Sequence, residues 1–145
     1  MIRNEKEYKQ AVERLKAEES RLDEQRKALK AEGLGKSQIK NLMDPMISFH
    51  LQLKEEVETY ERLKRGEFAE LQDLGGLGRL LVASRIYRGI SQRDLATKLD
   101  VHETQVSRDE RNEYHGISID RATKILEALG VRLRTQVEMR PLEHT

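Results

Sequence analysis

The most informative segment of the chain is residues 90–108, which reads ISQRDLATKLDVHETQVSR. Ser91 is a typical helix N-cap residue, and Asp94 stands three positions later, at the capping-box position. Apolar side chains follow at the spacing of one face of a short helix. They are Leu95, Ala96 and Leu99.

The same segment predicts a second helix placed close to the first. Residues 100–102 form a tight turn, and the next helix covers 103–111 with Val106 facing inward. Two helices that cross closely need a small side chain at the crossing, and Ala96 supplies it. The spacing is that of a helix-turn-helix.

The outward face of the second helix carries polar side chains that can reach base edges in the major groove of DNA. The N-terminus of the first helix can present backbone N–H groups to a phosphate. The candidate DNA-binding residues are Ser91, Gln92, Arg93, His102, Glu103, Thr104, Gln105, Ser107, Arg108, Arg111, Asn112 and Tyr114.

Residues 77–130 resemble the lambda-repressor-like, or Xre-type, helix-turn-helix family. The matching positions are Arg85, Gly89-Ile90-Ser91-Gln92, Leu95-Ala96, Leu99, Val101, Val106-Ser107-Arg108, Glu110 and Ala128-Leu129-Gly130. The resemblance implies a compact five-helix DNA-binding domain whose recognition helix begins near Glu103. We therefore expect a sequence-specific DNA-binding transcriptional regulator, a repressor that acts as a dimer. A dimer of this motif places its recognition helices one DNA turn apart, so we expect an inverted-repeat operator in double-stranded DNA.

Four positions depart from the family pattern. Asp100 stands where glycine is usual, and His102 where a serine or threonine cap is usual. Glu103 replaces a common glutamine, and Asp109 replaces a bulky apolar residue. Glu103 would repel phosphate, although its carboxylate can accept a hydrogen bond from cytosine N4. The departures bear on base preference more than on the fold.

The first half of the chain predicts two long antiparallel helices with one narrow, coiled-coil-like apolar seam each. In the first helix the seam repeats every seven residues, and residues 33–35 then break the helix. The second helix begins at Asp44-Pro45, or at Ser37 with a kink at Pro45, and ends near Arg65-Gly66. The seam residues are Tyr8, Leu15, Leu22 and Leu29, then Met46, Phe49, Leu53, Val57, Tyr60 and Leu63. This hairpin either packs on itself or serves dimerisation or partner docking.

Residues 131–138 alternate apolar and polar side chains, which predicts a half-buried β-strand. Its apolar positions are Val131, Leu133, Thr135 and Val137. A single strand needs a partner, which a second copy of the chain can supply. We therefore expect a homodimer held by this strand, by the hairpin, or by both.

Composition excludes several classes of protein. Charged residues make up 37% of the 145 residues, and 27 basic residues balance 26 acidic ones, so bulk charge indicates no particular partner. The lack of cysteine excludes disulfides and thiol chemistry. Four histidines without metal-ligand spacing, His50, His102, His115 and His144, and the lack of a catalytic or phosphate-binding motif predict no enzyme, metal or cofactor. Neither a signal-peptide core nor a membrane span is visible, so we expect a cytoplasmic protein.

The sequence thus predicts an all-α protein with three parts. They are a helical hairpin over 1–74, a five-helix lambda-repressor-like domain over 75–130, and a short β-strand and tail over 131–145. The layout is similar to that of HigA-type antitoxins, which implies a toxin protein as a partner and repression of its own operon. The alternative is a protein-interaction module that binds through the hairpin, with the helix-turn-helix as scaffold.

Overall fold

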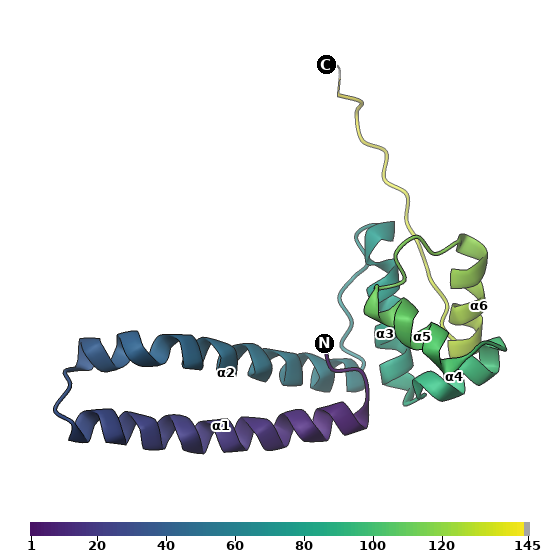
Figure 1. The fold of residues 1–145 in the computed structure, drawn as a ribbon. Helices are drawn as coiled ribbons and strands as arrows, with labels where there is room; N and C mark the ends of the chain where they lie inside the picture. Colours follow the sequence, from purple (N-terminus) through teal and green to yellow (C-terminus); the bar gives the residue numbers. More distant parts are fainter. Residues whose placement is uncertain (144–145) are drawn as a thin grey trace.

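The computed structural model describes residues 1–143, and this part of the chain contains six α-helices, one short 3-10 helix and no β-strand. The elements are α1 (Glu5–Ala31), α2 (Lys36–Lys64), the 3-10 helix η1 (Leu74–Gly76), α3 (Leu77–Arg88), α4 (Gln92–Leu99), α5 (Glu103–Arg111) and α6 (Ile119–Leu129). The hairpin of α1 and α2 extends from one side of the cluster formed by α3 to α6 (Figure 1). Among the described residues, no helix is both long enough and apolar enough to cross a membrane.

The hairpin holds together along a narrow seam that contains most of the predicted residues, but Phe49 is 72% exposed and does not belong to it. The aromatic rings of Tyr8 and Tyr60 stack with their centroids 5.0 Å apart, and the hydroxyl of Tyr8 donates a hydrogen bond to Glu61. Further along, the ring of His50 lies 3.2 Å from the carboxylate of Glu18. The fully buried apolar residues of the two helices are Ala11, Met43, Val57 and Tyr60. Most other side chains of the hairpin are exposed or half-buried.

Of the two predicted starts of the second helix, Asp44-Pro45 is wrong and Ser37 is correct to within one residue. The helix begins at Lys36, and the backbone N–H of Gly35 donates a hydrogen bond to the Gln38 side chain at its start. Pro45 lies inside the helix and is exposed. Water can therefore replace the hydrogen bond that its missing N–H forfeits, so the helix continues through it.

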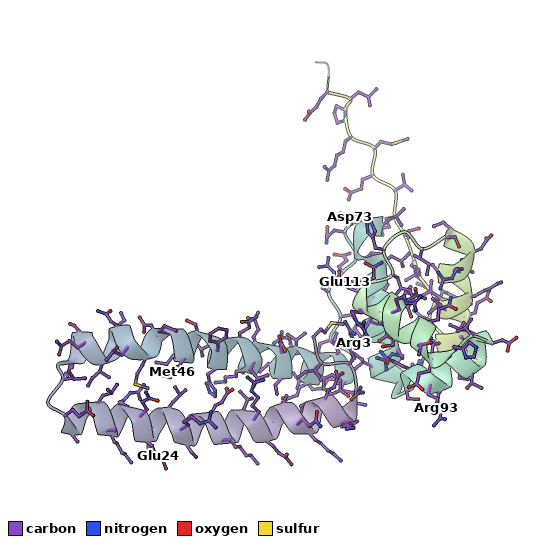
Figure 2. The ribbon with its side chains drawn as sticks, viewed as in Figure 1. Arg3, Glu24, Met46, Asp73, Arg93 and Glu113 are labelled. Carbon is purple, nitrogen blue, oxygen red and sulfur yellow. The ribbon has the colours of Figure 1, made fainter. Side chains whose placement is uncertain are left out.

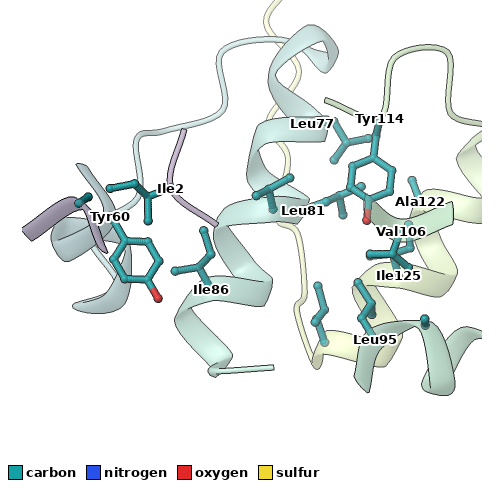
Figure 3. Close-up of a cluster of buried hydrophobic side chains, with 14 of the residues drawn as sticks. Ile2, Tyr60, Leu77, Leu81, Ile86, Leu95, Val106, Tyr114, Ala122 and Ile125 are labelled. Atoms are coloured by element: carbon teal, nitrogen blue, oxygen red, sulfur yellow. The ribbon is translucent and has the colours of Figure 1, made fainter. Parts of the chain in front are cut away.

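The cluster of α3 to α6 has its own apolar core, with α3 at its centre. Figure 3 shows Leu81, Leu95, Val106 and Ile125 gathered between the helices. Gly78 lets α3 pass closely under the segment after α5. A Cβ atom at this position would lie only 1.7 Å from the carbonyl oxygen of Glu113, so the close approach requires glycine.

The hairpin joins this core at its base. Ile2, Tyr60 and Ile86 are buried together on the side of α3 that faces the hairpin (Figure 3). The guanidinium of Arg85 also donates a hydrogen bond from Nη2 to the carbonyl oxygen of Arg3, at 2.8 Å. The N-terminal segment is thus bound directly to α3.

Two predictions about the second half of the chain are wrong. The region 75–130 contains four α-helices and a single 3-10 turn instead of five helices. The predicted β-strand over 131–137 is absent, because residues 131–143 have no regular structure and the side chain of Val137 is 85% exposed. An apolar–polar alternation forms a strand only against another strand, and the described helices offer no edge for pairing. His144 and Thr145, the end of the predicted 131–145 segment, lie outside the described residues.

Candidate DNA-binding surface

The crossing of α4 and α5 has the predicted geometry. Ala96 on α4 and Val106 on α5 are almost completely buried, and the N–H of Val101 donates to the carbonyl of Ala96 at 3.0 Å. Asp100 occupies the left-handed conformation, with φ of 56°, at the C-cap of α4. Aspartate tolerates this conformation better than most residues, so the turn forms without a glycine. The second helix begins at Glu103, as predicted.

The two faces of α5 differ sharply. Its inner face buries Val106 and Glu110. Its first turn is open to solvent, and Arg108 continues the exposed surface because it lies three and four positions after Gln105 and Thr104. The exposed candidates of the helix and its N-cap are His102, Glu103, Thr104, Gln105 and Arg108, while Ser107 is half-buried.

The N-terminus of α4 lies beside this helix. The hydroxyl of Ser91 accepts a hydrogen bond from the N–H of Asp94 at 3.0 Å, so the serine side chain caps the helix. The first backbone N–H groups of a capped helix point outward and can meet an anion. Arg93 is exposed and extends away from the cluster (Figure 2). The half-buried Gln92 donates its side-chain amide to Glu110 at 3.0 Å, which links α4 to α5.

A buried ion pair positions the recognition helix. Arg85 on α3 and Glu110 on α5 are 2% and 0% exposed, and Arg85 Nη2 donates to Glu110 Oε1 at 2.8 Å. A second guanidinium nitrogen, Nη1, donates to the carbonyl of Ile90. Because the fork geometry of arginine fixes direction as well as distance, the pair sets the angle between α3 and α5. Sequence reasoning marked both residues as family positions but missed their pairing.

Some candidate residues lie apart from the exposed face of α5. Tyr114 is buried against the core, and burial, with the carboxylates of Glu110 and Asp109 nearby, raises the pKa of its hydroxyl above the ordinary range. The structure therefore does not bring the Tyr114 side chain to this surface. Arg111 and Asn112 are exposed at the end of α5. Asp109 is half-buried and accepts a hydrogen bond from Arg121 at 2.7 Å, which explains how an acid replaces the family's apolar residue.

Comparison with known proteins identifies the class of this domain. A family model described as Helix-turn-helix matches residues 84–136, which span the end of α3, all of α4, α5 and α6, and the first residues beyond. No curated protein and no solved structure matches the chain. The match confirms the helix-turn-helix, a fold of DNA-binding transcription regulators, in just over a third of the chain. It does not extend to the hairpin.

Proposed function

We propose that this protein is a sequence-specific transcriptional repressor that binds an inverted-repeat operator as a homodimer in the cytoplasm. Recognition helix α5 enters the major groove with Thr104 and Gln105 toward base edges. Arg93, Arg108 and the N-terminus of α4 contact phosphates on either side of the groove.

The observation that carries this proposal is the division of α5 into a buried and an exposed face. Val106 and Glu110 hold the helix in the domain, while the side chains of its first turn are polar and exposed. The division leaves Thr104, Gln105 and Arg108 exposed together at the start of the second helix of the motif, which is the part of such a helix that enters the major groove. The side-chain amide of Gln105 can donate one hydrogen bond to adenine and accept another from it at the same time. This pair of hydrogen bonds distinguishes adenine from the other bases.

The proposal is tested by selecting a binding site from random duplex DNA and then measuring affinity for that site and for a scrambled duplex. Gln105→Ala should weaken binding to the selected site by about 10- to 100-fold, because one bidentate base contact contributes ~1–3 kcal/mol of discrimination. Binding to the scrambled duplex should hardly change. Gln25→Ala, in the exposed part of α1, is the matched control and should alter neither affinity. Equal losses on both duplexes would show that Gln105 does not read bases.

The finer proposal is that the protein is the antitoxin of a toxin–antitoxin pair and represses its own operon. The long hairpin supports it, since most residues of α1 and α2 are exposed and leave a surface for a protein partner. A small co-transcribed reading frame beside the gene, whose product copurifies with the protein and is toxic alone, is the expected finding. A gene with no such neighbour contradicts this finer form and leaves the repressor proposal intact.

A second candidate function is a protein-interaction module that uses the helix-turn-helix only as scaffold. It is favoured by the exposed apolar side chains of α2, among them Leu42 and Phe49. The two candidates differ in their response to DNA, because a scaffold has no reason to bind duplex DNA in a salt-dependent manner.

A further inference from the structure

The free end of the hairpin carries a groove of about 380 Å³ between the end of α1 and the start of α2. Apolar side chains, including Met43 and Ile47, line its floor. Four basic side chains surround them: Arg26, Lys30, Lys36 and Lys40. The groove therefore combines an apolar surface with concentrated positive charge, at the end of the molecule remote from the helix-turn-helix (Figure 1).

Few acidic residues lie among the cations that line this groove. Residues 26–40 contain five basic residues and one acidic residue, and one of the five, Lys27, pairs with Asp23 just outside this stretch. Asp44 lies four positions after Lys40 on the same helix. Within the described residues, none of the four lining cations forms an ion pair. Lys36 is also the first residue of α2, where the helix dipole disfavours cations. An acidic group from outside the hairpin would relieve both effects.

The second half of the same helix has the complementary character. Residues 51–61 contain four acidic residues and one basic residue, a net charge of −3. Leu51 is 55% exposed there, although it is a large apolar residue. Lys40, Ile47, Leu51 and Glu58 follow one another at intervals of seven, four and seven residues, which places all four on one face of α2.

We propose that this face of α2 binds the same face of a second copy in antiparallel orientation. The midpoint between positions 40 and 58 is 49, and the midpoint between 47 and 51 is also 49. A single two-fold axis at that level therefore brings Lys40 to Glu58 of the second copy and Ile47 to its Leu51. Each contact occurs twice, as an isologous interface requires. The inference rests on the proposed homodimer and assigns its surface.

The opposite flank of α2 is the competing surface. Phe49 is 72% exposed and Leu42 is 56% exposed there, in a part of the helix with almost no charged residues. That flank offers no charge complement for the basic groove. A lysine at position 49 therefore serves as a matched control for the proposed interface, because it puts a charge on the same helix at the same level but on the other side.

Sedimentation equilibrium of the full chain at low salt tests the interface by exchange of charges. Lys40→Glu and Glu58→Lys should each weaken dimerisation by about tenfold or more, because each creates two like-charge contacts across the axis. The double variant Lys40→Glu/Glu58→Lys restores both pairs and should dimerise within about threefold of the wild type. Phe49→Lys should leave dimerisation unchanged. Circular dichroism establishes that every variant remains helical.

The possible outcomes distinguish failure of the proposed α2 interface from failure of the proposed homodimer. A dimer that is insensitive to both single charge changes, a double variant that stays monomeric, or loss of the dimer in Phe49→Lys would overturn the interface while the proposed homodimer stands. A wild type that stays monomeric at high micromolar concentration would overturn the interface and the homodimer together. Binding of DNA by single helix-turn-helix domains would remain measurable in that case.

Discussion

The hairpin and the helix-turn-helix domain are both helical and highly charged, yet they bury their side chains very differently. Helix α1 has 27 residues and a single buried one, Ala11. Helix α3 has 12 residues, and eight of them are buried. Hydrophobic burial is the dominant favourable contribution to folding, so we expect the second domain to contribute most of the stability.

The two regions also differ in the exposure of their ion pairs. The pair of Arg85 and Glu110 is shielded from water, whereas the hairpin pairs, such as Lys27 with Asp23, are exposed. Breaking a buried pair leaves a charge without solvent or partner, which costs far more than breaking an exposed one. Changes in the helix-turn-helix should therefore alter stability and DNA binding together, and changes in the hairpin should alter association.

The largest effect is expected from Glu110→Ala. It leaves the guanidinium of Arg85 buried and unpaired, so the free energy of unfolding should fall by about 3–5 kcal/mol. Asp23→Ala, which breaks the exposed pair with Lys27, should change it by less than ~1 kcal/mol. Urea denaturation of both variants measures the contrast. Similar losses in the two variants would mean that the regions do not differ as described.

A smaller loss is expected from Ala96→Leu at the crossing of α4 and α5. Ala96 is 2% exposed, so added side-chain atoms should overpack the crossing and cost ~1–3 kcal/mol. The tilt of α5 should weaken DNA binding as well. Ala17→Leu, on the exposed surface of α1, is the matched control and should change stability by less than about 0.5 kcal/mol. Thermal unfolding measures the loss of stability, and DNA titration measures the loss of affinity. If Ala96→Leu changes neither, then α4 and α5 do not cross at Ala96.

The smallest effect is expected from Glu18 in the middle of the hairpin. Partial burial raises its pKa, but hydrogen bonds from His50 and Arg14, together with their charges, outweigh burial and hold the pKa below its usual 4.5. A lowered folded-state pKa contributes stability above pH 4.5 that is lost as the pH falls through the folded value. Glu18→Gln should therefore cost about 0.5 kcal/mol near neutral pH and nothing in strong acid.

Measuring the free energy of unfolding of the wild type and of Glu18→Gln from neutral pH to strong acid tests the direction of this pH dependence. Glu24→Gln, at an exposed position of the same helix, is the control and should differ little from the wild type at any pH. A difference between wild type and Glu18→Gln that grew in acid would contradict the assignment.

The two regions also differ in how far sequence reasoning could predict them. In the helix-turn-helix, caps and apolar spacing determine local structure, so the start of α5 at Glu103 and the burial of Ala96 and Val106 were predicted correctly. In the hairpin, the sequence left two starts of α2 open, because Asp44-Pro45 has the composition of a helix start and Ser37 precedes it. The structure decides for the earlier one, since α2 begins at Lys36 and contains Pro45.

Contacts between residues far apart in the chain could not be predicted from the sequence. The alternation over 131–137 is the pattern of a strand, but hydrogen-bonding partners decide whether a strand forms, and the described chain provides none. The partnership of Arg85 with Glu110 joins residues 25 positions apart, and their charges would ordinarily place both on the surface. The pairing of Asp109 with Arg121 was invisible for the same reason.

The salt dependence of affinity tests whether the outward face of α5 and the N-terminus of α4 bind DNA. Full-length protein is titrated with a labelled duplex of its selected site at several salt concentrations. We expect log affinity to fall linearly with log salt, by about 0.9 per phosphate neutralised, and Arg108→Ala to lower the slope by about one for each protomer. A flat response to salt, or no binding at low salt, would contradict it.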